Sequence, residues 1–161
     1  MILSLKNKTS HGYDNITNIL LKKISPSILH PLQYVINRSF QEAHFPNKMK
    51  FAIVSPLYKK DDKHQFMNYR PVSLLPILSK ILEKCIFNRI YNFMEKHGII
   101  NHSQYGYRQK HSTQDAGIEL LKDILEANEQ KKYTIAVFCD MSKAFDTINH
   151  KHVLYKLQRY G

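Results

Sequence analysis

Apolar residues recur at helical spacing along the first part of the chain. From Asp14, a favourable N-cap residue, the positions Ile16, Ile19, Leu20 and Ile24 fall on one helical face. Ser25-Pro26 then supplies a second cap, with proline at the first helical position. A second apolar stripe follows it and should stop before Phe45-Pro46. Its members are Ile28, Leu29, Leu32, Val35, Ile36 and Phe40. The pattern predicts two successive helices.

The pattern changes between residues 51 and 71. Residues 51–58 are apolar and partly β-branched, which is typical of a strand, but Pro56 cannot donate to a β-ladder. We therefore expect an edge strand. The following stretch, 59–71, is polar and basic with two aromatic residues, and it predicts a loop or a hairpin tip.

Helical spacing returns twice in the second half of the chain. One long stripe should end near His97-Gly98, where glycine suits a left-handed cap. The stripe consists of Ile77, Leu78, Ile81, Leu82, Cys85, Ile86, Ile90, Phe93 and Met94. After a connection over 99–111, Ser112 or Thr113 caps a further helix. We expect that helix to turn inward Ala116, Leu120, Leu121, Ile124 and Leu125.

The run from Tyr133 to Cys139 is apolar on both faces and ends at Asp140. Such a run predicts a central strand buried on both sides. A last helix should begin near Asn149 and bury Val153, Leu154 and Leu157. These patterns predict an α+β fold that is incomplete, because a buried strand needs more sheet partners than the chain offers.

Composition indicates a partner for the chain. Its 161 residues suffice for one ordinary domain or part of a larger one, and 24 Lys+Arg against 13 Asp+Glu leave a net charge of +11. Clustered cations favour binding to a polyanion such as nucleic acid, whereas a basic surface that only aids solubility is the alternative. No apolar stretch is long enough for a membrane helix, and no export signal is evident. We expect an intracellular protein, nuclear or cytoplasmic, with Cys85 and Cys139 reduced.

Two groups of residues could carry chemistry. Asp140 follows an apolar strand, a position typical of catalytic or metal-binding carboxylates, although capping of the next turn is the alternative. Asp146 could approach the same crevice but fits a cap better. The second group combines basic and aromatic side chains that suit contacts with phosphates and bases. The alternative interpretation is a solvated loop without a ligand. The group comprises Lys59, Lys60, Lys63 and Arg70 with Tyr58, Phe66 and Tyr69, next to Asp61 and Asp62. Spacings typical of zinc sites, nucleophile elbows and phosphate-binding glycine loops are lacking.

Several motifs together resemble the reverse transcriptase of non-LTR retrotransposons, in particular jockey and CR1-like elements. The two most specific are Asn68-Tyr-Arg-Pro-Val-Ser-Leu-Leu-Pro76 and Asp140-Met-Ser-Lys-Ala-Phe-Asp-Thr147. The others, in the same order as in the family, are His11-Gly-Tyr-Asp-Asn-Ile16, Ala52-Ile-Val-Ser-Pro-Leu-Tyr-Lys-Lys60, Leu78-Ser-Lys-Ile-Leu-Glu-Lys84, Gln104-Tyr-Gly-Tyr-Arg108 and His111-Ser-Thr113. The resemblance covers nearly the whole chain.

The resemblance implies a right-hand polymerase that is cut short. Residues 1–131 would form helix-rich fingers with an N-terminal extension, and residues 132–161 the first strand and helix of the palm. Asp140 matches the first palm aspartate, which with the backbone carbonyl of Met141 would help to hold Mg²⁺.

The resemblance also implies roles for other side chains. Lys59 or Lys60 and Arg70 match residues that grip the incoming triphosphate, and Phe145 matches the aromatic side chain that excludes a ribose 2′-hydroxyl. Three residues would lie along the template path: Gln104, Arg108 and Lys110. The implied partners are an RNA template, a DNA primer and a deoxynucleoside triphosphate.

The chain departs from the family in one respect. The block with the paired palm aspartates does not occur before Gly161, so only one of three metal-binding carboxylates is present. The expected function is therefore part of an RNA-directed DNA polymerase that is inactive alone. A non-catalytic nucleic-acid-binding remnant is the alternative.

Overall fold

The structure is a computed structural model that describes residues 2–141 and 144–161. Ser142 and Lys143, which belong to the motif that begins at Asp140, lie outside the described residues. The chain forms two compact units, Met1–Ile100 and Asn101–Gly161. The predicted boundary near residue 131 concerns polymerase subdomains and stays a prediction.

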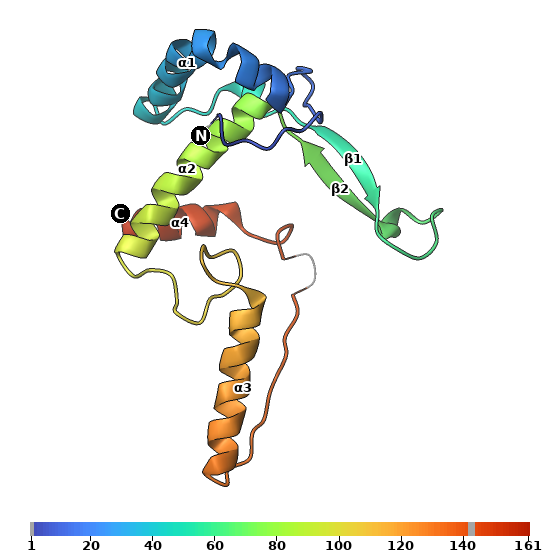
Figure 1. Cartoon of the computed structure of the whole chain (residues 1–161), viewed down its shortest axis with the longest axis vertical. Helices are drawn as coiled ribbons and strands as arrows, with labels where there is room; N and C mark the ends of the chain where they lie inside the picture. Colours follow the sequence, from blue (N-terminus) through green and yellow to red (C-terminus); the bar gives the residue numbers. More distant parts are fainter. Residues whose placement is uncertain (1, 142–143) are drawn as a thin grey trace. The chain divides into compact units, whose positions relative to one another are not determined.

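The first long helix, α1, runs without a break from Asn18 to Gln41, so the prediction of two helices is wrong (Figure 1). Thr17 is its N-cap, and its side-chain oxygen accepts a hydrogen bond from the Leu20 N–H at 3.2 Å. Pro26 lies inside the helix and cannot donate to the carbonyl of Lys22. The Ser25 hydroxyl donates to that carbonyl instead, at 2.8 Å. Ser25 thus satisfies the acceptor that the proline leaves free, and the helix continues.

A hairpin follows the short 3₁₀ turn Asn47–Met49. Its strands are β1, Ile53–Tyr58, and β2, Tyr69–Leu74, and a second 3₁₀ turn, Phe66–Asn68, immediately precedes β2. The expected edge strand and hairpin tip are confirmed, whereas β2 was not foreseen because Pro71 and polar residues mask its pattern.

The register explains how both strands tolerate proline. Pro56 lies opposite Pro71. The Lys59 N–H donates to the Asn68 carbonyl at 2.8 Å, so Lys59 and Asn68 form a hydrogen-bonded pair. Hydrogen-bonded and non-hydrogen-bonded pairs alternate along an antiparallel ladder, and the two prolines therefore form a non-hydrogen-bonded pair. An N–H at either position would point away from the partner strand, and its absence costs no ladder bond.

Helix α2 runs from Ile77 to Lys96 and packs against α1 to form the core. The buried cluster consists of Ile2, Leu21, Leu32, Ile77 and Ile81. Leu82 is also buried, with 1% of its surface exposed. Gly98 follows the helix with φ +62°, which confirms the predicted left-handed glycine near its end.

Gly12 lies buried against the junction between β2 and α2. A Cβ atom at this position would lie 2.5 Å from the Pro76 nitrogen and 2.9 Å from the Leu75 carbonyl carbon. Neighbouring Tyr13 donates its hydroxyl to the Lys48 carbonyl at 2.5 Å and sets its ring edge against Phe51. The segment His11–Tyr13 therefore contacts the chain just before β1 and just after β2.

The second unit contains α3, Thr113–Glu129, and α4, His150–Tyr160. Ser112 and Asn149 are their N-caps, in agreement with the sequence. The apolar stripes of both helices, however, are mostly exposed, so their predicted burial is wrong in this chain. Of the predicted inward residues, Ala116 and Leu157 alone are partly buried.

Residues 133–139 form no strand and are exposed throughout, which corrects the prediction of a buried central strand. Figure 1 draws this stretch as a plain trace. A strand requires a partner for its backbone groups, and the described residues outside the β1–β2 hairpin supply none. The described chain is therefore a mixed structure of helices and one two-stranded antiparallel sheet, the coarse form of the predicted α+β fold.

Candidate functional site

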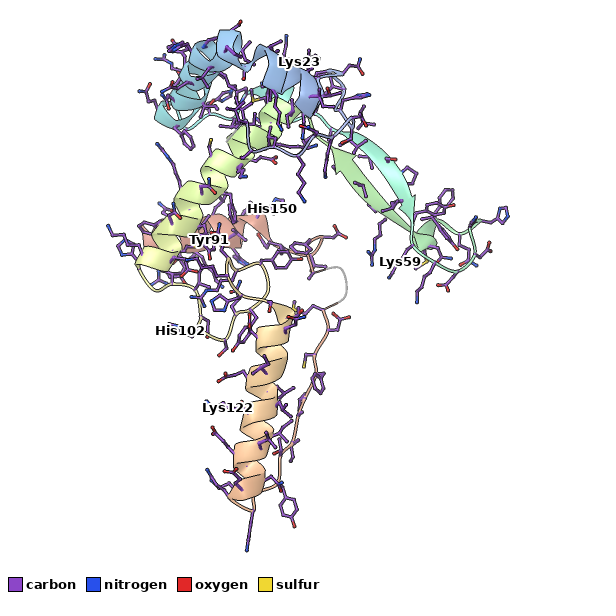
Figure 2. The ribbon with its side chains drawn as sticks, in the orientation of Figure 1. Lys23, Lys59, Tyr91, His102, Lys122 and His150 are labelled. Atoms are coloured by element: carbon purple, nitrogen blue, oxygen red, sulfur yellow. The ribbon has the colours of Figure 1, made fainter. Side chains whose placement is uncertain are left out.

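The β1–β2 hairpin carries the predicted nucleotide-binding cations. Arg70 lies opposite Leu57, and side chains alternate along a strand, so Arg70, Leu57 and Lys59 share one face of the hairpin. Lys60 is the next residue in the turn. All three cations are exposed, and Figure 2 shows Lys59 at the outer end of the hairpin. The hairpin thus presents Lys59 and Arg70 to solvent from the same side.

The turn beyond these strands is closed by its own hydrogen bonds. The Asp62 carbonyl accepts from the Asn68 side-chain amide at 2.8 Å and from the Gln65 N–H at 3.3 Å. An Asp62 carboxylate oxygen accepts from the His64 N–H at 2.9 Å. Asp61 adopts φ +69°, a conformation that aspartate tolerates better than most residues. Residues 59–68 are therefore an ordered turn.

The predicted template residues lie on the connection that precedes α3. The Gln104 amide donates to the Gly106 carbonyl at 3.2 Å. The Arg108 guanidinium donates to the carbonyls of Asn101, at 3.1 Å, and His102, at 3.5 Å. Lys110 is exposed at φ +63°. Arg108 therefore holds this loop together, whereas Lys110 is presented to solvent.

The predicted catalytic segment lies in the same unit. Asp140 and Met141 are exposed at the end of the unpaired stretch 133–139. The Phe145 ring lies edge-on to the Tyr107 ring, with centroids 5.8 Å apart at 85°. The structure thus brings Phe145 into contact with the Gln104–Arg108 segment, although 37 residues lie between Tyr107 and Phe145 in the sequence.

Magnesium can be tested against the donor groups that the structure describes. No group of three or more His, Cys, Asp or Glu that could hold a metal ion occurs among the described residues. Asp140 offers one exposed carboxylate, whereas Mg²⁺ takes octahedral oxygen coordination, with carboxylates and phosphates completing it. The residues described here therefore do not by themselves fit a magnesium site.

Three features of the site escaped the sequence prediction. Tyr107, the partner of Phe145, was read only as part of a motif, and Gly12 gave no signal that it abuts Pro76. Phe66 was grouped with Tyr58 and Tyr69 as an aromatic residue of the hairpin, and the sequence pattern gave no reason to expect a different structural role for it. Contacts between residues far apart in the sequence leave no mark on local spacing.

A groove of about 740 Å³ also lies in the first unit. Its lining is mainly apolar and includes Leu3, Pro26, Leu29, Ile36 and Ile81. None of the predicted site residues lines it. Among the described helices, none is both long and apolar enough to cross a membrane.

Comparison with known proteins identifies the class. Residues 58–161 match the family of reverse transcriptases (RNA-dependent DNA polymerases). The match begins at the last residue of β1 and includes the basic turn, Asp140 and Phe145. The chain belongs to this family, and the resemblance seen in its motifs is confirmed.

Individual relatives come from mobile elements of Drosophila melanogaster. The chain is 36% identical over 159 residues to the probable RNA-directed DNA polymerase from transposon BS. It is 31% identical over 160 residues both to the corresponding X-element protein and to the RNA-directed DNA polymerase from mobile element jockey. These alignments cover 98–99% of this chain but 18% of each relative. The chain thus spans less than a fifth of the length of these relatives.

Proposed function

We propose that this chain forms the fingers and the beginning of the palm of an RNA-directed DNA polymerase of a non-LTR retrotransposon. The observation that carries the proposal is the register of the hairpin, which sets Lys59 and Arg70 on one exposed face. Guanidinium and ammonium groups on the same face suit a polyphosphate, because arginine offers paired donors and lysine a compact charge. The incoming deoxynucleoside triphosphate is the ligand we assign to this face, with Lys60 in the adjacent turn.

The second unit supplies groups for the sugar and the template. Phe145 is proposed to exclude the ribose 2′-hydroxyl, and its edge-on contact with Tyr107 supports a fixed ring position. Gln104, Arg108 and Lys110 are proposed to follow the RNA template. Because Arg108 also donates to the carbonyls of Asn101 and His102, it would in addition shape the loop that presents Lys110.

Asp140 and the Met141 carbonyl are proposed as a partial set of magnesium ligands. The remaining carboxylates and the bound phosphates must come from elsewhere in a complete active site. The contribution of this chain would be one negatively charged side chain at the end of residues 133–139.

The triphosphate assignment can be tested on the 161-residue protein. We expect a fluorescently labelled deoxynucleoside triphosphate to bind in a salt-dependent manner, as measured by fluorescence anisotropy. Replacing Lys59, Lys60 and Arg70 together by Ala removes three exposed charges and should weaken binding roughly tenfold or more. A matched variant with Lys122, Lys131 and Lys132 replaced by Ala changes the net charge equally and should bind nearly as the wild type does. Equal loss in both triple variants would show that net charge alone governs binding and would contradict the assignment.

A further inference from the structure

The aromatic residues of the hairpin divide into two kinds. Tyr58 and Tyr69 contact each other with ring centroids 5.6 Å apart, and their hydroxyls donate to the carbonyls of Asp61 and Lys63 within the turn. The Lys63 ammonium lies 5.5 Å from the Tyr58 ring centroid. Both tyrosines therefore serve to hold the turn together.

Phe66 has no such role. It is 93% exposed, and the adjacent Met67 is 89% exposed. Their exposure does not arise from a loose loop, since both lie in the 3₁₀ turn Phe66–Asn68. The Asn68 N–H donates to the Gln65 carbonyl at 3.1 Å, and the Asn68 amide donates to the Asp62 carbonyl. An ordered turn thus presents two large apolar side chains to solvent.

The charges around this turn indicate which kind of partner covers Phe66 and Met67. Lys59, Lys60, Lys63 and Arg70 outnumber Asp61 and Asp62. One Asp62 carboxylate oxygen is already bonded to the His64 N–H. An aromatic face among excess cations is the combination that binds single-stranded nucleic acid, because cations contact phosphates while every base has a face for stacking.

We propose that Phe66, flanked by Met67, is a stacking platform for an unpaired base of single-stranded RNA. The proposal extends the proposed polymerase function, since the RNA would be the template strand ahead of the nucleotide held by Lys59 and Arg70. Because stacking uses only the face of the base, the platform should accept any of the four bases.

The test uses the absence of tryptophan from the sequence. Phe66→Trp places a single indole at the platform, and Tyr34→Trp places one at an exposed position on α1 as a control. Binding of a short single-stranded RNA should quench the fluorescence of the first variant and leave that of the second nearly unchanged. An abasic oligonucleotide with the same number of phosphates should quench neither.

Affinity provides a second measurement. Phe66→Ala should weaken binding of single-stranded RNA roughly five- to a hundredfold, and Phe66→Leu should weaken it similarly because leucine is apolar but has no π-face. The salt dependence of binding should stay as in the wild type, since no charge is removed.

The outcomes separate this proposal from the polymerase function. RNA binding with the expected salt dependence but without quenching overturns the platform and leaves the proposed function standing. Absence of any RNA binding overturns both. Quenching that depends on protein concentration without RNA, or on anionic lipid vesicles, would assign Phe66 to self-association or to a membrane surface and would equally overturn the proposal.

Discussion

Helices α2 and α3 have similar apolar periodicity but different surroundings. On α2 the N-terminal part of the stripe is buried, with Ile81 2% and Leu82 1% exposed, whereas on α3 Leu121 is 56% exposed. The spacing of apolar residues determines which face of a helix is apolar. Whether another part of the chain covers that face depends on residues elsewhere in the sequence.

The same contrast extends to the two units. In the first, α1, α2 and Ile2 cover one another and form a core. In the second, no described residue of Asn101–Gly161 is fully buried, and Tyr133 is completely exposed. The described residues of the second unit thus leave its apolar surface exposed.

The contrast predicts unequal effects of the same substitution in the two units. Leu82→Ala should destabilise the first unit by about 2–5 kcal/mol, because it leaves a cavity in a packed core. Leu121→Ala on α3 should change stability by less than about 1 kcal/mol, since the side chain is already half exposed. Urea unfolding followed by far-ultraviolet circular dichroism measures both. Equal destabilisation would mean that α3 is covered in solution.

Replacing one glycine in each unit by alanine should change the stability of the two units in opposite directions. Gly12→Ala should destabilise the first unit by about 1–3 kcal/mol, because the added Cβ would overlap the Pro76 backbone. Gly117→Ala lies within α3 with no atom near its Cβ, and should stabilise that helix by roughly 0.5–1 kcal/mol. Thermal unfolding of each variant gives the sign. A Gly12→Ala protein as stable as the wild type would show that the contact with Pro76 is looser than described.

The N-terminus of α3 provides a smaller, pH-dependent effect. The Asp115 pKa lies below its ordinary value of 3.8, first because the Ser112 hydroxyl donates to the carboxylate, at 2.8 Å, and next because the Ser112 N–H does so, at 2.7 Å. A lowered folded-state pKa means that the stabilisation is complete above pH 3.8 and is lost as the pH falls through the folded value. Helicity of α3 should therefore decline in acid below that point.

Variants at the cap identify the cause of this decline. Ser112→Ala should lower the stability of α3 by roughly 1 kcal/mol near neutral pH. Asp115→Asn should abolish the decline of α3 helicity in acid. Amide hydrogen exchange of the first turn of α3 reports both changes. An acid transition that persists unchanged in Asp115→Asn would assign it to another carboxylate.

Much of the local structure was predictable, because caps and periodicity act over a few residues. Ser112, Asn149 and Gly98 mark helix ends as expected. The break expected at Ser25-Pro26 did not occur, since a serine hydroxyl that normally caps a helix start can also satisfy the carbonyl freed by a proline. The second strand was missed because its hydrogen bonds depend on pairing with β1, which its own composition does not reveal.

The candidate site was predictable in identity but not in arrangement. Charge clustering indicated Lys59 and Arg70, and the apolar run before it indicated Asp140, whereas Phe145 came from the motif resemblance alone. The family match bears out the resemblance and leaves the roles of these residues to experiment. The contact of Phe145 with Tyr107 and the exposure of Phe66 follow from tertiary structure. The prediction of a buried strand at 133–139 was wrong for this chain. Apolar residues on both faces show only that a segment is suited to burial, whereas a strand also needs a neighbouring strand, and the described chain provides none.

Amide hydrogen exchange of the 161-residue protein tests the contrast between the units most directly. We predict slow exchange at Ile81 and Leu82, where the helix is part of a packed core, and fast exchange throughout residues 133–139, whose backbone forms no ladder. Comparable protection of 133–139 would mean that this segment is paired within the chain, and would contradict the contrast between a packed first unit and an exposed apolar surface on the second.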